Sequence, residues 1–133
     1  MIFGIRPEEL IDKLIKQAEA IYGRNPIVNK VLDKAFERVG KFADNFYGFQ
    51  DQSLAMLRML RSWYAREYTG LSKQAVVSLL ASAIYIASPF DIIPDFIPFI
   101  GKLDDRLILA YFIKKLNVEI QRYMAWEQEK GFA

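Results

Sequence analysis

The residues best suited to chemistry in this chain are four aspartates within a fifteen-residue stretch. Asp91 and Asp95 lie among prolines and large apolar residues, and Asp104 and Asp105 follow shortly after Gly101. Carboxylate oxygens are the ligands that Mg²⁺ and Ca²⁺ prefer, although this spacing is not that of an EF-hand loop. One interpretation is therefore a metal site that serves a metal-dependent hydrolase or an accessory of phosphoryl transfer.

Two other interpretations of the aspartates need no metal. In the first, each carboxylate accepts hydrogen bonds from backbone N–H groups of a tight turn or of a helix start. In the second, the carboxylates pair with arginines, because no basic residue lies between Lys73 and Lys102 and a charge among apolar neighbours needs a partner. Arg58 and Arg61 lie on the preceding helix. We predict structural ion pairs between one of these arginines and one of four carboxylates: Asp91, Asp95, Asp104 and Asp105.

The composition excludes several classes of enzyme and of binding protein. The chain has 133 residues with no Cys and no His, which excludes disulfides, zinc fingers, thiol catalysis and Ser-His-Asp triads. No Gly-rich phosphate loop or GxSxG motif occurs. A net charge of +2, with no basic tail, gives no reason to expect a nucleic-acid partner. Any catalysis would have to use Asp, Glu, Lys, Ser, Tyr or a bound cofactor. We expect a non-enzymatic helical module with no cofactor, because the chain has more apolar side chains than so small a domain can bury.

The elements that must position these residues are all helical. Apolar residues recur at spacings of three and four, and no segment alternates with the period of a strand. We predict a single-domain, all-α bundle over residues 1–133, with N-terminal helices in 1–52 and a proline-rich elbow between the last two of about five helices. The predicted helices run from Pro7 to Ile21, from Asn25 to near Gly48, from Asp51 or Ser53 to Tyr68, from Ser72 to Ala87, and from Asp104 to Trp126.

The predicted fourth helix is apolar on nearly every side, which leaves two interpretations. Its uninterrupted apolar stretch, Ala75 to Ala87, has thirteen residues. At about 1.5 Å per residue this spans roughly 20 Å, against about 30 Å for the hydrocarbon core of a bilayer. The segment is either a buried core helix or a membrane-contacting segment. Trp63, Tyr64 and Trp126 are likewise either interfacial aromatics or core residues.

The elbow carries more apolar side chains than so small a domain can bury. We predict that it contacts a membrane surface or a partner protein, or a second copy of the chain in a homo-oligomer. The N-terminus shows no secretory signal, so we expect a cytoplasmic protein at the inner face of the membrane. The predicted contact residues are Phe90, Phe96, Phe99 and Ile100.

Residues 85–105 read Y-x-x-S-P-F-D-I-I-P-D-F-I-P-x-x-G-x-L-D-D, which resembles the signature of the YkvA-like family, also called domain of unknown function 1232. Ile92 stands where Leu is common, and Arg106 follows where small or apolar residues are frequent. Weaker likeness extends over residues 53–128 and includes Arg66-Glu67-Tyr68 and Ala125-Trp126-Glu127. The resemblance implies a small helical protein, often membrane-associated, and it implies no particular activity.

Overall fold

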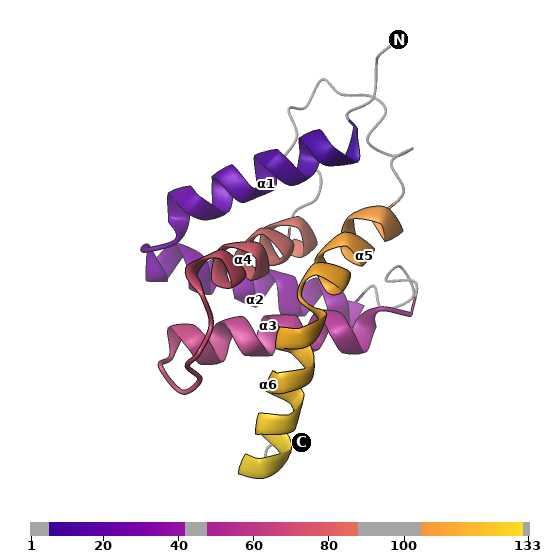
Figure 1. The fold of residues 1–133 in the computed structure, drawn as a ribbon. Helices are drawn as coiled ribbons and strands as arrows, with labels where there is room; N and C mark the ends of the chain where they lie inside the picture. The colour runs from indigo at the N-terminus through magenta and orange to yellow at the C-terminus, as the bar shows by residue number, and fades with distance from the viewer. Residues whose placement is uncertain (1–5, 42–47, 88–104, 132–133) are drawn as a thin grey trace.

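The computed structural model describes residues 6–41, 48–87 and 105–131. Over these ranges the chain forms six α-helices and no strand, so the predicted all-α class is confirmed. Figure 1 shows the helices packed around one another. They are α1 (Pro7–Ile21), α2 (Asn25–Lys41), α3 (Gln50–Tyr64), α4 (Lys73–Ala87), α5 (Asp105–Lys115) and α6 (Asn117–Lys130).

The first two helices form a hairpin that covers α4. α1 starts at Pro7, and the Glu9 carboxylate accepts a hydrogen bond of 3.1 Å from the Arg6 backbone N–H. This contact satisfies a backbone donor at the helix start. α1 and α2 run in opposite directions, joined by a short turn, and both contact α4 (Figure 1). Their buried residues recur every three or four positions, as the sequence predicts: Leu10, Leu14 and Ala18 on α1, and Val28, Leu32, Ala35 and Val39 on α2.

The fourth helix is the centre of the core. Every residue from Ala75 to Ala87 is buried, and α4 contacts α1, α2, α3 and α5. The Ser72 hydroxyl accepts a hydrogen bond of 3.1 Å from the Ala75 N–H and so caps the helix start. Inside the core, the Ser82 hydroxyl donates to the Leu79 carbonyl at 2.6 Å. Of the two interpretations of this segment, the structure supports the core helix. None of the described helices has the length and apolarity needed to cross a bilayer.

The end of α3 differs from the sequence prediction. The helix ends at Tyr64 rather than Tyr68, because Arg66 adopts a left-handed backbone conformation with φ of 64°. The Arg66 N–H donates to the Trp63 carbonyl and the Glu67 N–H donates to the Ser62 carbonyl, which completes a Schellman motif. Glycine usually takes this position, and a residue with a Cβ atom there costs roughly 1–2 kcal/mol.

The predicted last helix is divided into two. A bend at Leu116, with φ of −103° and ψ of 14°, separates α5 from α6, although the Leu116 and Ile120 N–H groups still donate to carbonyls four residues earlier. No Pro or Gly marks this position in the sequence. Because α5 packs on α1, α3 and α4 whereas α6 packs on α3, we attribute the bend to tertiary packing.

The proline-rich elbow, residues 88–104, lies outside the described residues, as do residues 42–47, where the second helix was predicted to continue toward Gly48. The predicted elbow therefore stays a prediction.

Candidate functional site

Most of the predicted site residues lie outside the described part of the chain. This holds for Asp91, Asp95 and Asp104 and for the whole predicted contact surface, Phe90, Phe96, Phe99 and Ile100. Asp105 is the first residue of α5, and only its backbone is described. The metal site and the arginine–aspartate pairs therefore stay predictions. Within residues 6–41, 48–87 and 105–131, no cluster of three acidic side chains is arranged to hold a metal ion.

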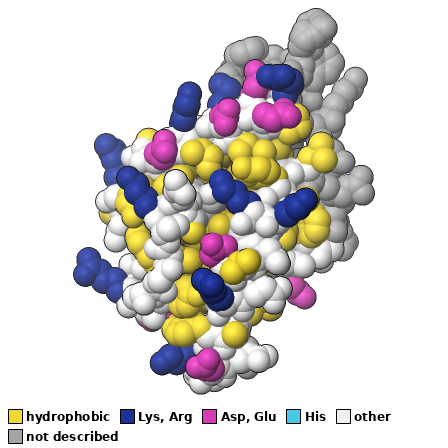
Figure 2. Space-filling view, in the orientation of Figure 1, with side chains coloured by type: hydrophobic (Ala, Val, Ile, Leu, Met, Phe, Trp, Pro, Cys, Tyr) yellow, Lys and Arg dark blue, Asp and Glu magenta, His cyan; other side chains and the backbone are white. Residues whose placement is uncertain are grey.

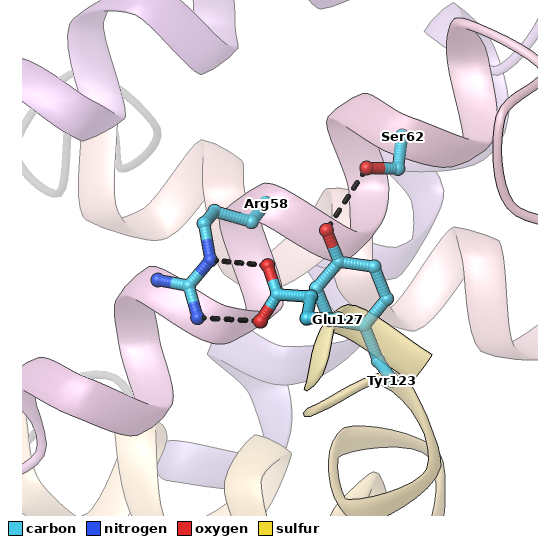
Figure 3. A network of polar contacts seen from close by, with 4 residues as sticks. All are labelled: Arg58, Ser62, Tyr123 and Glu127. Carbon is cyan, nitrogen blue, oxygen red and sulfur yellow. Dashed lines mark hydrogen bonds and ion pairs between the residues drawn. The ribbon is translucent and has the colours of Figure 1, made fainter. Parts of the chain in front are cut away.

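Arg58 forms an ion pair that the sequence analysis did not predict. Its Nε and Nη2 atoms donate to the two carboxylate oxygens of Glu127 at 2.7 and 3.0 Å (Figure 3). This bidentate geometry is the strongest that an arginine and a carboxylate can form. The Glu127 side chain is 7% exposed and the Arg58 side chain 37%. Hydrogen bonding to Glu127 raises the pKa of Arg58 against an opposing effect of burial.

One helical turn further on, a second polar contact joins the same two helices. The Ser62 and Tyr123 hydroxyls share a hydrogen bond of 2.9 Å (Figure 3). Positions 58 and 62 on α3 thus face positions 127 and 123 on α6. The Tyr123 ring also contacts Tyr68 edge-on and stacks with Trp126, at centroid distances of 5.0 and 5.5 Å. Trp126 also contacts the Tyr68 ring, in the α3–α4 connection, at 5.1 Å and packs partly buried against the core, which agrees with one of the two alternatives that the sequence left open for it.

The second candidate arginine, Arg61, faces a different neighbour. Its guanidinium lies 4.4 Å from the centroid of the Phe36 ring on α2, within the range of a cation–π interaction. This contact places Arg61 on the side of α3 that packs against α2. The predicted pairing of either arginine with the aspartates stays a prediction, because those carboxylates are not described.

An open, aromatic-lined groove lies where the α1–α2 turn meets the α3–α4 connection. We call it the aromatic groove, and its volume is about 460 Å³. Half-buried rings form its walls, and exposed polar residues form its rim. Its lining residues are Tyr22, Gly23, Asn25, Trp63, Tyr64, Arg66, Tyr68 and Thr69.

The walls of the aromatic groove are fixed by contacts between distant segments. The Tyr64 hydroxyl donates to the Tyr22 carbonyl at 2.6 Å, which ties the end of α3 to the turn after α1. Trp63 contacts the rings of Tyr64 and Tyr22 at centroid distances of 4.9 and 5.9 Å. Burial, with a smaller contribution from Tyr22, raises the pKa of Tyr64 to about 12. Lys73 Nζ lies 5.1 Å from the centroid of the Tyr22 ring.

A second surface feature is the solvent-facing side of the last two helices. Leu107, Tyr111 and Val118 are 53%, 39% and 56% exposed. Apolar side chains exposed singly are ordinary, whereas several exposed together can mark an interaction surface. Together with Lys114 they occupy positions i, i+4, i+7 and i+11, which share one face of a helix. The hydrogen-bonded backbone through Leu116 continues this face across the bend. The α5–α6 outer face comprises Leu107, Tyr111, Lys114, Lys115, Val118 and Arg122.

The α5–α6 outer face combines apolar and cationic side chains. Lys115 Nζ lies 5.7 Å from the centroid of the Tyr111 ring, so cation and ring are neighbours on the surface. Glu119 is the acidic residue between Leu107 and Arg122, against three cations. Figure 2 shows hydrophobic side chains exposed in patches on one side of the molecule, with Lys and Arg side chains between them.

A hollow of about 540 Å³ adjoins this face between α1, α4 and α5. Asp12 and Glu19 line it together with Lys73 and Lys115. Since the opposite charges balance, the hollow favours neither an anion nor a cation, and we assign no ligand to it.

Comparison with known proteins connects part of the chain to a described family. Residues 75–113 match the family model described as "Protein of unknown function (DUF1232)", and this stretch runs from α4 into α5. The chain is also 33% identical over 69 residues to the "Uncharacterized membrane protein YkvA" of Bacillus subtilis (strain 168). That match covers 52% of this chain and 65% of the relative. No solved structure matches the chain. The resemblance seen in the sequence is confirmed: the chain carries a YkvA-like DUF1232 region.

The ion pair between Arg58 and Glu127 predicts unequal effects of removing its two partners. Arg58→Ala strands a buried carboxylate, whereas Glu127→Ala leaves an arginine that reaches solvent. Breaking a fully buried pair costs about 3–5 kcal/mol. Because Arg58 is partly exposed, we expect a loss of about 2–3 kcal/mol for Arg58→Ala and about 1–2 kcal/mol for Glu127→Ala, measured by urea unfolding.

The control for this prediction is Lys41→Ala, which breaks an exposed pair with Glu37 at 3.0 Å. That change should cost less than about 0.5 kcal/mol. The prediction is wrong if Arg58→Ala destabilises the protein no more than Lys41→Ala, or less than Glu127→Ala.

The raised pKa of Tyr64 predicts a loss of stability at alkaline pH. The phenol ionises near its usual value of 10.0 in the unfolded chain and at about 12 in the folded chain. At a pH between these two pKa values, the folded chain keeps the Tyr64 proton whereas the unfolded chain loses it. The stability that Tyr64 contributes therefore falls as pH rises from about 10 to 12. With solvent screening of this half-buried group, we expect a loss of about 1 kcal/mol.

The measurement is the difference in unfolding free energy between the wild type and Tyr64→Phe, followed from about pH 8 to pH 11.5. Every other group is common to both proteins, so its contribution cancels in this difference. We expect a constant difference below about pH 10 that shrinks above it. A difference that stays constant over the whole range would contradict the assignment.

Proposed function

We propose that this chain is a peripheral membrane-binding module that contacts an anionic bilayer surface through the α5–α6 outer face. The observation that carries the proposal is the alternation of exposed Leu107, Tyr111 and Val118 with exposed cations on one helical face. Interfacial helices combine such apolar residues with Lys and Arg in this way. The proposal assigns no catalytic activity to the chain.

The name of the relative supports the same assignment. The relative that shares 33% identity is called a membrane protein, and the matched family region runs into α5. The predicted apolar elbow, which lies just before α5 in the sequence, would add Phe90, Phe96, Phe99 and Ile100 to the same contact. Since α4 is buried inside the bundle, we propose contact with the membrane surface rather than insertion across it.

The charges on this face set the expected strength and location of binding. Each Lys or Arg near an anionic membrane surface contributes about 1 kcal/mol, and Glu119 opposes the three cations with a similar magnitude. Asp12 and Glu19 line the adjoining hollow together with Lys115 and reduce the contribution of that lysine. Partial burial of three apolar side chains adds a few kcal/mol. The sum corresponds to reversible, salt-sensitive binding. Anionic lipids are concentrated in the cytoplasmic leaflet, so we propose the inner face of the membrane as the binding site.

Sedimentation with lipid vesicles tests the proposal. The wild type should bind vesicles that contain phosphatidylglycerol, should bind phosphatidylcholine vesicles weakly, and should be released by high salt. The variant Lys114→Glu/Lys115→Glu should bind phosphatidylglycerol vesicles at least about tenfold more weakly. Leu107→Ser/Val118→Ser should also weaken binding, because it removes the apolar contact.

The matched control is Lys30→Glu/Lys34→Glu, which reverses two exposed lysines on α2 and leaves α5 and α6 intact. Reversing any two lysines weakens the overall attraction between the protein and an anionic surface. Once this general effect is allowed for, at matched salt, we expect the control to bind within about twofold of the wild type. Equal losses in the two charge variants would show non-specific attraction and overturn the assignment of the face. If the wild type does not bind anionic vesicles, the proposed function is wrong. Binding of a protein partner through the same face would then take its place as the proposal.

A further inference from the structure

The aromatic groove has the chemistry of a ligand site that is separate from the membrane-binding surface. None of the residues of α5 and α6 whose side chains the structure describes lines it. Its walls carry the rings of Tyr22, Trp63, Tyr64 and Tyr68, while its rim carries Arg66 and the polar residues Asn25 and Thr69. Ligand pockets typically combine apolar walls of this kind with a few polar groups that fix orientation.

The charges around the aromatic groove favour an anion. Arg66 is the one charged residue among the eight that line it. Arg24 lies between the lining residues Gly23 and Asn25 in the sequence, and Lys73 lies against the Tyr22 ring. Figure 2 shows Lys and Arg side chains projecting at the left of the view, where Figure 1 places the α1–α2 turn and the α3–α4 connection. Among the described residues, no carboxylate lines the groove. Glu67 lies between the lining residues Arg66 and Tyr68 in the sequence, so one nearby carboxylate stands against the three nearby cations Arg24, Arg66 and Lys73.

The backbone conformation of Arg66 is a second observation, independent of the surrounding charges, that supports an anionic ligand. Its left-handed backbone conformation is one that glycine adopts without strain and that arginine rarely adopts. Within the part of the chain that the structure describes, its exposed guanidinium has no ion-pair partner that would explain the choice. Strain of this kind is concentrated at functional sites. Arginine is suited to such a position because its planar guanidinium binds a carboxylate or phosphate through two hydrogen bonds.

We propose that the aromatic groove binds a small amphipathic oxyanion, a carboxylate or phosphate ester on an apolar or aromatic body, with the oxyanion at Arg66 and the apolar body along the aromatic walls. The inference does not depend on membrane binding by the α5–α6 outer face. The ligand has two possible sources, a soluble ester or the headgroup of a lipid, which share the same chemistry at the groove.

Nuclear magnetic resonance of the full chain tests the proposal with phenyl phosphate as the probe. The chain has two tryptophans, and Trp63 lines the groove whereas Trp126 does not. Phenyl phosphate should therefore shift the Trp63 indole N–H resonance in a saturable way. It should shift that of Trp126 less, because Trp126 contacts the groove only through the Tyr68 ring, at 5.1 Å. A small ligand of this size should bind with a Kd on the order of millimolar.

Three further probes separate the parts of the ligand. Phenyltrimethylammonium carries the same ring with the opposite charge and should not bind, and inorganic phosphate lacks the ring and should bind at least about fivefold more weakly. Short-chain phosphatidylglycerol below its micelle concentration represents the lipid source. Saturable shifts of Trp63 with either this lipid or phenyl phosphate support the proposal, and the tighter of the two identifies the source.

The decisive variant is Arg66→Gly, because glycine fits the left-handed position and should leave the fold intact. We expect this variant to unfold at the same or a higher temperature and to bind phenyl phosphate at least about tenfold more weakly. Arg66→Lys should retain part of the affinity, and Lys16→Ala, an exposed change on α1, should retain all of it.

Three results would overturn the proposal. They are no saturable shift of Trp63 with either ester, unchanged affinity in Arg66→Gly, and equal binding of phenyltrimethylammonium. Loss of vesicle binding in the α5–α6 variants would not affect these measurements, so the two proposals fail separately.

Discussion

Burial of α4 on all of its sides is the constraint on which the rest of the structure depends. A helix that is apolar around its whole circumference cannot lie at the surface of a bundle, so other helices must cover each of its faces. α1 and α2 cover much of it, and α3 and α5 contact the remainder. The family match begins in α4 and ends in α5, so helices outside the matched region supply most of the cover.

The attachment of α6 to α3 depends on the way the helices pack around α4. α5 packs on the core, whereas α6 turns away at Leu116 and is held to α3 by the Arg58–Glu127 ion pair and the Ser62–Tyr123 hydrogen bond. The buried side of the two helices is thereby fixed. The opposite side, with Leu107, Tyr111 and Val118, faces solvent. Exposure of large apolar residues beside cations is thus a consequence of packing, and membrane binding would give it a function.

The sequence predicted the helices with strong apolar periodicity or clear caps. Pro7 and Asn25 begin helices as predicted, and Ser72 caps α4. The end of α3 was missed because its stop signal is Arg66 in a left-handed conformation, which no residue type there announces. The bend at Leu116 was missed because it arises from packing on different neighbours. Glu127 was missed as the partner of Arg58 because the two positions are far apart in the sequence and come together only in the fold. Once the fold is known, the contacts follow a simple pattern: 58 and 62 on α3, four residues apart, face 127 and 123 on α6, also four residues apart.

The central claim is that α4 remains a buried core helix while the α5–α6 outer face meets the membrane. The chain has no cysteine, so single thiols introduced by Ser82→Cys and Val118→Cys report on each position. The direct measurement is the rate of reaction of each thiol with a water-soluble maleimide, with and without phosphatidylglycerol vesicles. The account predicts fast reaction at position 118 that vesicles slow by at least about fivefold, and very slow reaction at position 82 in both conditions. Unchanged reaction at position 118, or vesicle-induced exposure of position 82, would contradict it.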